Sequence, residues 1–214
     1  MAASKIVDLR NLLAERFPHP PLPCVSRFST GVPAFDEATN GGLPKGAITE
    51  LTTGNVSAGS ASFICALLQQ IYRAANFLAL IDGRDSFDPE PLGNPRLRHL
   101  LWVRCTAASD ALKAADLLLR DQNFPVVVLD LVLNEPVELR KIPQTNWYRL
   151  QRLVEPTATA FLVLGRHRMV SSAQLKLTLE NSWTLENLQQ DHSLSRVRFG
   201  LRGEYSGQII EAVS

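Results

Sequence analysis

The sequence predicts an α/β protein with a mostly parallel, twisted sheet flanked by helices and an antiparallel extension at the C-terminal end. Three observations predict this class. Apolar runs alternate with segments of helical periodicity between residues 47 and 164. Four of these runs, such as 125–130, are almost entirely apolar, which is typical of parallel strands covered by helices on both faces. Beyond Ser172, polar and apolar residues alternate over shorter runs, which indicates antiparallel strands with one solvated face.

Each core element follows from its local pattern. The predicted helix at 60–75 has apolar residues at the i, i+3, i+4, i+7 spacing of one face, starting at Ile64. A turn-rich segment containing Gly41 and Gly42 precedes the first core strand. The predicted strands are 47–52, 76–82, 100–104, 125–130 and 158–164, and the other predicted helices are 107–121 and one within 137–154.

The N-terminal segment is predicted to be a separate element. Apolar residues recur at helical spacing over 5–16, and a proline cluster from Pro18 to Pro23 ends the helix. We therefore expect residues 1–24 to form an N-terminal helix and proline-rich linker, and residues 25–214 to form one core domain.

Composition and charge restrict the function classes. At 214 residues and 45% hydrophobic content, the chain can bury a substantial core. Its 22 Lys and Arg against 21 Asp and Glu give a formal net charge of +1, so a nucleic-acid or membrane partner would need a local patch. No run approaches the roughly 18 apolar residues of a membrane span, and we expect a cytoplasmic protein without membrane contact.

The three cysteines indicate neither a disulfide framework nor a zinc site. Cys24, Cys65 and Cys105 are odd in number, far apart and free of C-x-x-C spacing. The sequence also contains no G-x-S-x-G elbow of a hydrolase. We expect no metal and no cofactor.

The stretch GNVSAGSAS at 54–62 lies where a nucleotide-binding protein carries its phosphate loop. Gly54 and Gly59 have the G-x-x-x-x-G spacing, but the lysine and the metal-binding hydroxyl that should follow fall on Ser60 and Ala61. Ser62 cannot replace the hydroxyl, because one further helical residue rotates the side chain by about 100°. The sequence predicts a degenerate phosphate loop that could hold an anion weakly through its backbone, without tight binding of magnesium nucleotide.

Asp130 ends the apolar strand FPVVVLD, where a Walker B aspartate would reach the magnesium shell. The alternative is an aspartate that caps a turn. Together with the glycine spacing of 54–62, the Walker B-like position is the favoured hypothesis.

The chain resembles the RecA core in several segments that occur in the expected order over roughly residues 1–205. FSTGVPAFDEATNGGLPKGAITEL is similar to the segment that leads into the first core strand of RecA-type recombinases, and LALIDGRDSFDP is similar to the strand and loop that carry their catalytic glutamate. The resemblance implies a RecA-like core. It also implies that Arg84 replaces the catalytic glutamate and that the γ-phosphate-sensing glutamine falls on or near Arg166.

Within this group, the best resemblance is to the ImuA type, carried by KIVDLRNLLAERF, the lysine-free loop and VRCTAASDALKAADLLLRDQNFPVVVLDL. This resemblance implies a catalytically inactive adaptor in SOS-induced translesion DNA synthesis that binds RecA and ImuB-type partners. The alternative from the enzyme class is a divergent RecA-family ATPase that uses Arg84 or Lys45 in place of the loop lysine.

Two further alternatives concern binding surfaces. A nucleic-acid or partner patch could form at 140–152, where aromatic residues that could stack on bases are interleaved with cations that could meet phosphates. Its members are Arg140, Lys141, Trp147, Tyr148, Arg149 and Arg152. The simpler hypothesis is an amphipathic helix that buries its aromatic residues. Residues 5–16 could mediate head-to-tail self-association or docking on another RecA-like subunit, or could pack on their own domain.

Overall fold

The computed structural model describes residues 26–54, 59–180, 200–205 and 208–213. The predicted N-terminal helix and proline-rich linker at 1–24 and the loop residues 55–58 lie outside the described residues.

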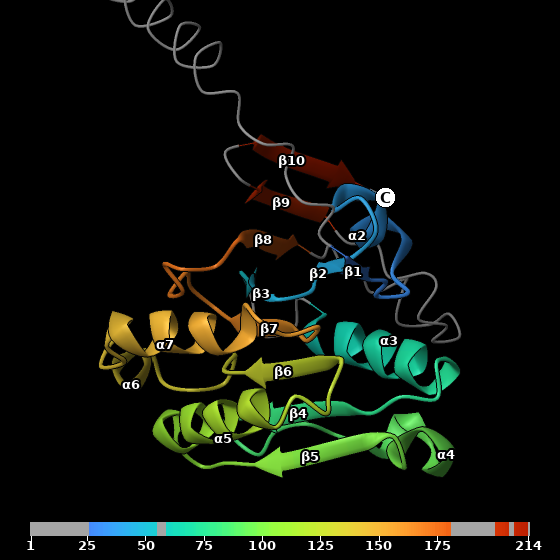
Figure 1. Ribbon diagram of the computed structural model, residues 1–214, viewed down its shortest axis with the longest axis horizontal. Coiled ribbons are helices and arrows are strands. Elements are labelled where there is room, and N and C mark those ends of the chain that lie inside the picture. Colours follow the sequence, from blue (N-terminus) through green and yellow to red (C-terminus); the bar gives the residue numbers. More distant parts are fainter. Residues whose placement is uncertain (1–25, 55–58, 181–199, 206–207, 214) are drawn as a thin grey trace, which may run out of the picture.

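A mixed eight-stranded sheet forms the centre of the described chain, in the order β10-β9-β8-β3-β7-β6-β4-β5 (Figure 1). The strands are β3 (Ala47–Thr53), β4 (Leu78–Asp82), β5 (Leu100–Arg104), β6 (Val126–Asp130), β7 (Ala160–Gly165), β8 (Leu175–Glu180), β9 (Gly200–Tyr205) and β10 (Gln208–Val213). From β8 to β5 the strands are parallel, whereas β9 and β10 are antiparallel. The predicted fold class is confirmed, with one correction: β8 was expected in the antiparallel extension but pairs in parallel with β3.

The three helices predicted between the strands are present as α3 (Ser60–Arg73), α5 (Ala108–Asp121) and α7 (Gln144–Val154). The segment expected to hold one helix within 137–154 is divided, because the short helix α6 (Pro136–Leu139) precedes α7. The short elements α2 (Pro33–Ala38), α4 (Asn94–Leu97), η1 (Glu90–Leu92), β1 (Arg27–Phe28) and β2 (Leu43–Pro44) were not predicted, because they are too short to show a clear period.

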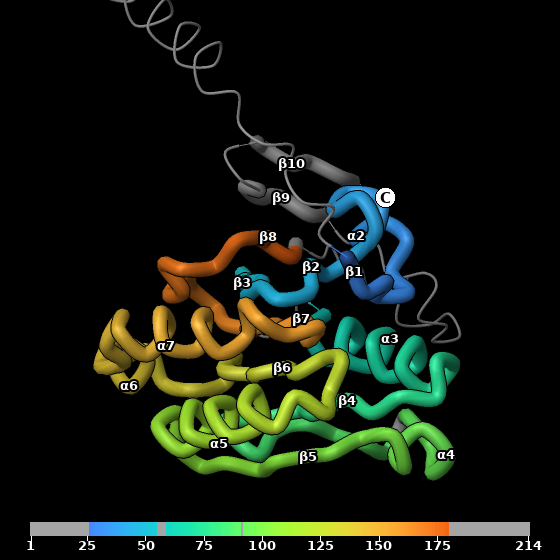
Figure 2. Tube along the Cα trace, viewed as in Figure 1, coloured from blue at the N-terminus to red at the C-terminus, as the bar shows by residue number. Residues whose placement is uncertain are grey.

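Helices cover both faces of the parallel strands and divide the core into two layers. On β4, Leu78 and Leu80 belong to the layer that includes α3, while Ala79 and Ile81 belong to the layer with α5 and α7. This division follows the two-residue period of a strand. Figure 2 shows α5 and α7 side by side, with α3 away from them. Because both faces are covered, every residue of β4 is buried, which explains the continuous apolar run.

The carboxyl ends of the parallel strands meet at one edge of the sheet. In the register, Asp82 at the end of β4 lies beside Asp130 on β6 and Arg104 on β5. Strand β7 separates β6 from β3, and Thr52 lies beside Gly165 at the end of β7. The candidate site residues therefore follow neighbouring strand ends.

Candidate functional site

The turn before α3 contains a glycine in a left-handed conformation. Gly59 has a φ of 99°, a left-handed conformation that favours glycine. Helix α3 begins at the next residue, Ser60, which is buried, and the Phe63 N–H donates to the Gly59 carbonyl at 2.9 Å. Ala61 is exposed and Ser62 is half-buried. The turn supplies a helix N-terminus without a cationic side chain.

Lys45 cannot serve as a substitute cation for this turn. It precedes β3, whereas the loop follows β3, and the strand has 7 residues. At about 3.3 Å per residue, the strand separates Lys45 from the loop by roughly 20 Å, which is beyond the reach of a lysine side chain. The hypothesis that Lys45 replaces the loop lysine is therefore wrong.

Arg84 lies at the correct edge of the sheet but holds a neighbouring connection. Its Nη1 donates to the Thr106 carbonyl at 3.1 Å, between β5 and α5. Its backbone N–H donates to Asp82 Oδ1 at 3.2 Å. Arg84 therefore links the loop that follows β4 to the loop that follows β5.

Asp82 organises the turn after β4; it belongs to the segment LALIDGRDSFDP that resembles the recombinases, but the sequence assigned it no role. Its carboxylate is 1% exposed and accepts the N–H groups of Ser86 and Phe87, both at 2.8 Å, in addition to the Arg84 N–H. Trp102 Nε1 donates to the same carboxylate at 3.3 Å. The available signal was an aspartate that directly follows an apolar strand and precedes GRDS.

Asp130 has a weaker set of donors than its neighbour Asp82. Its Oδ1 accepts the Val132 N–H at 2.9 Å, a contact expected of a turn-capping aspartate. Burial raises the pKa of Asp130 to about 6, and the nearby Asp82 charge adds to this, while the Val132 N–H opposes it. A carboxyl group with this pKa exchanges its proton close to neutral pH.

Arg166 follows β7 and is also bound to the backbone. Its Nε donates to the Val132 carbonyl at 2.8 Å, and its side chain is half-buried. Arg166 and Asp130 therefore hold the two polar backbone atoms of Val132. The residue at the position expected for the γ-phosphate sensor therefore stabilises the loop that follows β6.

Glu50 in the middle of β3 is a buried anchor that sequence reasoning missed. It is 1% exposed, and its Oε1 accepts the N–H groups of Met169 and Val170, the latter at 2.8 Å. Burial raises the pKa of Glu50, and these two hydrogen bonds oppose the shift. The segment that follows β7 is thereby fixed to the central strand.

Asn134 joins the loop that follows β6 to the loop that follows β4. It is 0% exposed, and its Nδ2 donates to the Gly83 carbonyl at 3.0 Å. A Cβ atom at Gly83 would lie 2.4 Å from Asn134 Oδ1 and 2.8 Å from the Asp130 carbonyl. The two loops approach each other so closely that residue 83 must be glycine.

The predicted patch at 140–152 needs a correction. Trp147 is 1% exposed and belongs to the core layer with α5, so it cannot stack on bases; Tyr148 is 50% exposed. Arg149 pairs with Asp116 on α5 at 2.8 Å. Arg140, Lys141 and Arg152 are exposed. The alternative of an amphipathic helix that buries its aromatic residues is confirmed for Trp147, which recurs with Leu150 and Val154 at helical spacing on the buried face of α7, and is wrong for Tyr148.

Other chemistry is limited among the described residues. No group of three or more His, Cys, Asp or Glu side chains in this part of the chain could hold a metal ion. Cys65 and Cys105 are free thiols, half-buried and buried respectively. Within the same ranges, no helix is long and apolar enough to cross a bilayer.

Comparison with known proteins identifies similarity to bacterial RecA. No protein-family model matches the chain. The chain is 33% identical to RecA of Rubrobacter xylanophilus over 112 residues, 31% identical to RecA of Pseudomonas fluorescens over 111, and 29% identical to RecA of Thermosynechococcus vestitus over 110. Each alignment covers 50% of this chain. The chain spans 31% to 32% of the length of these relatives. The sheet and these similarities together support a RecA-like protein.

Proposed function

We propose that this chain is a RecA-like accessory protein of the ImuA type, which acts as a protein-binding adaptor in damage-induced translesion DNA synthesis and does not hydrolyse nucleotide. Its partners in this proposal are RecA and ImuB-type translesion components. The observation that carries the proposal is the turn at Gly59 and Ser60, where a left-handed glycine precedes a helix and where the lysine and the metal-binding hydroxyl of a phosphate loop are replaced by Ser60 and Ala61.

The energetics of phosphoryl transfer support this proposal. Catalysis of that reaction consists almost entirely of positioning and electrostatic stabilisation by the loop lysine, the metal ion and neighbouring polar groups. Removal of a single stabilising donor typically costs about a hundredfold to a thousandfold in rate. Ser60 and Ala61 remove two such groups at once.

The two arginines at the other expected ATPase positions support the same conclusion. A guanidinium group carries donors and no acceptor, and it does not deprotonate in proteins, so Arg84 cannot act as a general base. Arg84 and Arg166 bind the carbonyl groups of Thr106 and Val132 instead. Both arginines therefore have a structural role, because they fix the backbone of loops that follow the strand ends.

The adaptor role and the partners come from the ImuA resemblance. The similarity to RecA supports the broader statement, a RecA-related protein of recombination or repair. A cytoplasmic location and the absence of a bound cofactor are part of the proposal.

Calorimetry with ATP and magnesium tests the catalytic half of the proposal. We expect no measurable heat of binding and no hydrolysis above background. Hydrolysis by the purified chain that Asp130→Ala abolishes would overturn the proposal and establish the divergent ATPase.

Affinity purification of the full-length chain from DNA-damaged cells tests the partner half. We expect recovery of RecA and translesion polymerase components. Deletion of residues 1–20 then tests whether the N-terminal segment carries the RecA contact. Recovery of neither class of partner would contradict the adaptor role.

A further inference from the structure

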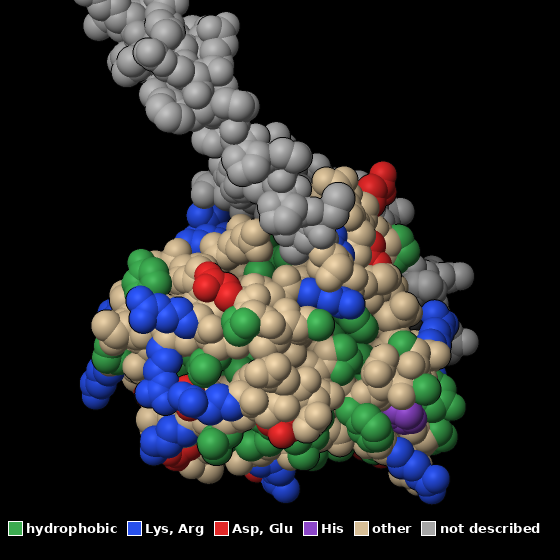
Figure 3. Space-filling view, in the orientation of Figure 1, with side chains coloured by type: hydrophobic (Ala, Val, Ile, Leu, Met, Phe, Trp, Pro, Cys, Tyr) green, Lys and Arg blue, Asp and Glu red, His purple; other side chains and the backbone are tan. Residues whose placement is uncertain are grey.

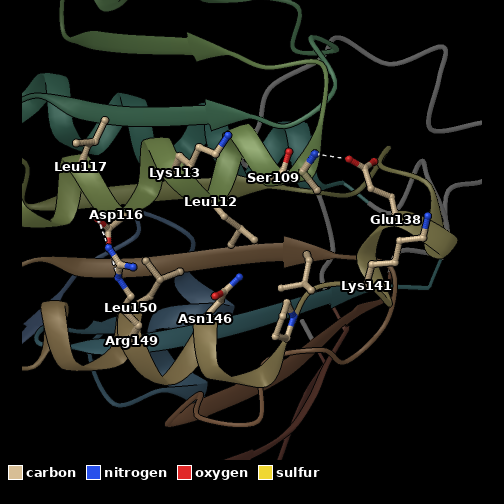
Figure 4. Close-up of a pocket in the computed structure, with 13 residues that line it drawn as sticks. Ser109, Leu112, Lys113, Asp116, Leu117, Glu138, Lys141, Asn146, Arg149 and Leu150 are labelled. Atoms are coloured by element: carbon tan, nitrogen blue, oxygen red, sulfur yellow. Dashed lines mark hydrogen bonds and ion pairs between the residues drawn. The ribbon is translucent and has the colours of Figure 1, made fainter.

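A groove lies between α5 and α7, on the layer of the molecule away from α3. Its volume is about 620 Å³. Figure 4 shows Leu112 from α5 and Leu150 from α7 directed into the gap between the two helices. Leu117, which also lines the groove, is 67% exposed. The groove therefore has an apolar floor and an accessible apolar side chain at its margin.

The acidic side chains that line the groove are bound to other groups of the protein, whereas the lysines are accessible to a partner. Both acidic groups are held within the protein: Asp116 by Arg149 and Arg120, and Glu138 by the Ala108 N–H and the Asn134 amide. The lysines are more accessible. Lys113 has a side chain that is 76% exposed and a single exposed partner, Asp110.

Lys141 completes this positive margin. It is exposed, and no ion pair involves it among the residues that the structure describes. Figure 3 shows Lys and Arg side chains gathered on the flank formed by α5, α6 and α7. The groove therefore presents a positive rim around an apolar floor.

Links between the helices bound the groove at both ends. Arg149 on α7 pairs with Asp116 at one end, and Glu138 on α6 accepts the Ala108 N–H at the other. The distance from 108 to 116 along α5 is about 12 Å at 1.5 Å per residue. This length matches about two turns of a docked helix, which would present apolar anchors at i, i+3 or i+4, and i+7.

We propose that this groove binds an acidic amphipathic helical segment of a partner protein. Its apolar anchors enter between Leu112, Leu117 and Leu150, and its Asp or Glu side chains meet Lys113 and Lys141. The proposal deepens the adaptor function and rests on it, because it assigns a docking surface and a chemical class of partner.

The composition of the surface favours a peptide over nucleic acid. An apolar floor contributes little to a phosphate backbone, whereas it accommodates the anchors of an amphipathic helix. The residue best suited to stack on a base, Trp147, is buried in the core.

Selection from a phage-displayed library of random linear peptides tests the proposal with the full-length chain. Counter-selection uses the double variant Leu117→Asp with Lys141→Glu, and a urea unfolding midpoint establishes that this variant is folded. We expect enriched peptides that combine Asp or Glu with apolar residues at helical spacing. Synthetic copies should bind at least about tenfold more weakly to each single groove variant, as is typical when an interface anchor is removed.

Matched variants outside the groove provide the control. Phe77→Asp changes an apolar residue that is 52% exposed, and Arg98→Glu reverses an exposed cation; neither residue belongs to the helices that form the groove. Both should retain full affinity. Failure to enrich peptides over the double variant would overturn the proposal, and so would peptides whose binding does not change in the groove variants.

Three further outcomes separate this proposal from the nucleic-acid alternative and from the proposed adaptor function. Binding of oligothymidylate that Lys141→Glu weakens and Leu117→Asp leaves unchanged, without enriched peptides, would assign the surface to nucleic acid and overturn the peptide proposal. If groove peptides bind as expected while the chain hydrolyses ATP, the docking site stands and the adaptor function alone fails. If RecA and translesion components are recovered equally with the groove variants, and no peptide is enriched, the groove proposal alone fails.

Discussion

Asp130 lies beside Asp82 on the adjacent parallel strand, and the two carboxylates have very different surroundings. Asp82 accepts three backbone N–H groups, while Asp130 accepts one. The weaker solvation of Asp130 and the neighbouring charge explain why burial can raise its pKa to about 6. The raised pKa of Asp130 makes the stability of the folded protein depend on pH.

Asp130→Asn should stabilise the protein at pH 7. The pKa of Asp130 rises from 3.8 to about 6 on folding, so the folded state favours the protonated form. The stability contribution of this group is fully present below pH 3.8 and is lost as the pH rises through about 6. A neutral amide avoids that loss and keeps an acceptor for the Val132 N–H. We expect a gain of about 1 to 3 kcal/mol in urea unfolding at pH 7 and little gain near pH 4.

Asp82→Asn is the matched control for that experiment. An amide offers a single acceptor oxygen where three N–H groups now bind a carboxylate, so the free energy of unfolding at pH 7 should fall by about 2 kcal/mol. If both variants lose stability equally at pH 7, the assigned difference between the two carboxylates is wrong.

Glu50→Ala should loosen the segment after β7. The variant leaves two backbone N–H groups, of Met169 and Val170, without their acceptor, and it opens a cavity at a residue that is 1% exposed. We expect a loss of about 2 to 4 kcal/mol in the free energy of unfolding, with faster amide exchange at Val170. Glu50→Gln retains an acceptor oxygen and should cost far less; equal losses for the two variants would contradict the anchoring role.

Gly83→Ala should destabilise the protein, and Gly54→Ala should not. The new Cβ at Gly83 would meet Asn134 Oδ1 at 2.4 Å and a backbone carbonyl at 2.8 Å, whereas no atom of the described residues lies within 4 Å of the corresponding position at Gly54. We expect a loss of about 1 to 3 kcal/mol at Gly83 and a change within about 0.5 kcal/mol at Gly54. Thermal unfolding of the two variants measures the difference, and a neutral Gly83→Ala would refute the close approach.

Trp147→Ala and Tyr148→Ala distinguish a core helix from a base-stacking helix. Trp147 is 1% exposed and Tyr148 is 50% exposed. We expect a loss of about 3 to 5 kcal/mol for Trp147→Ala and less than about 1 kcal/mol for Tyr148→Ala in denaturant unfolding. A folded, fully stable Trp147→Ala protein that had lost affinity for single-stranded DNA would reverse this assignment.

The regular core could be predicted from sequence because its signals are local. Strand β6 is an uninterrupted apolar run, and α3 and α5 have clear stripes at helical spacing. The same spacing distinguishes buried Trp147 from exposed Tyr148, since only the former aligns with Leu150 and Val154. The direction of β8 could not be predicted, because an alternating pattern does not specify whether its neighbour runs parallel or antiparallel.

The polar contacts of the site could not be predicted, because they join distant parts of the chain. The Glu50 carboxylate binds the Val170 N–H across a separation of 120 residues, and Arg166 binds the Val132 carbonyl across 34. Helix α2 was missed for a different reason. It has 6 residues and starts with Pro33, and Asp36 holds the preceding turn through Ser29 and Thr30.

The position of β3 between β7 and β8 also has a consequence for biosynthesis. Strand β3 ends at Thr53, yet its two partners begin at Ala160 and Leu175. During translation the strand emerges before either neighbour, because the segment from 54 to 159 must be made before β7 begins. Its pairing requires closure of long loops, which makes folding slow relative to local helix formation. A nascent chain stalled before Ala160 would expose both edges of its most central strand, and recruitment of chaperones should peak at that stage.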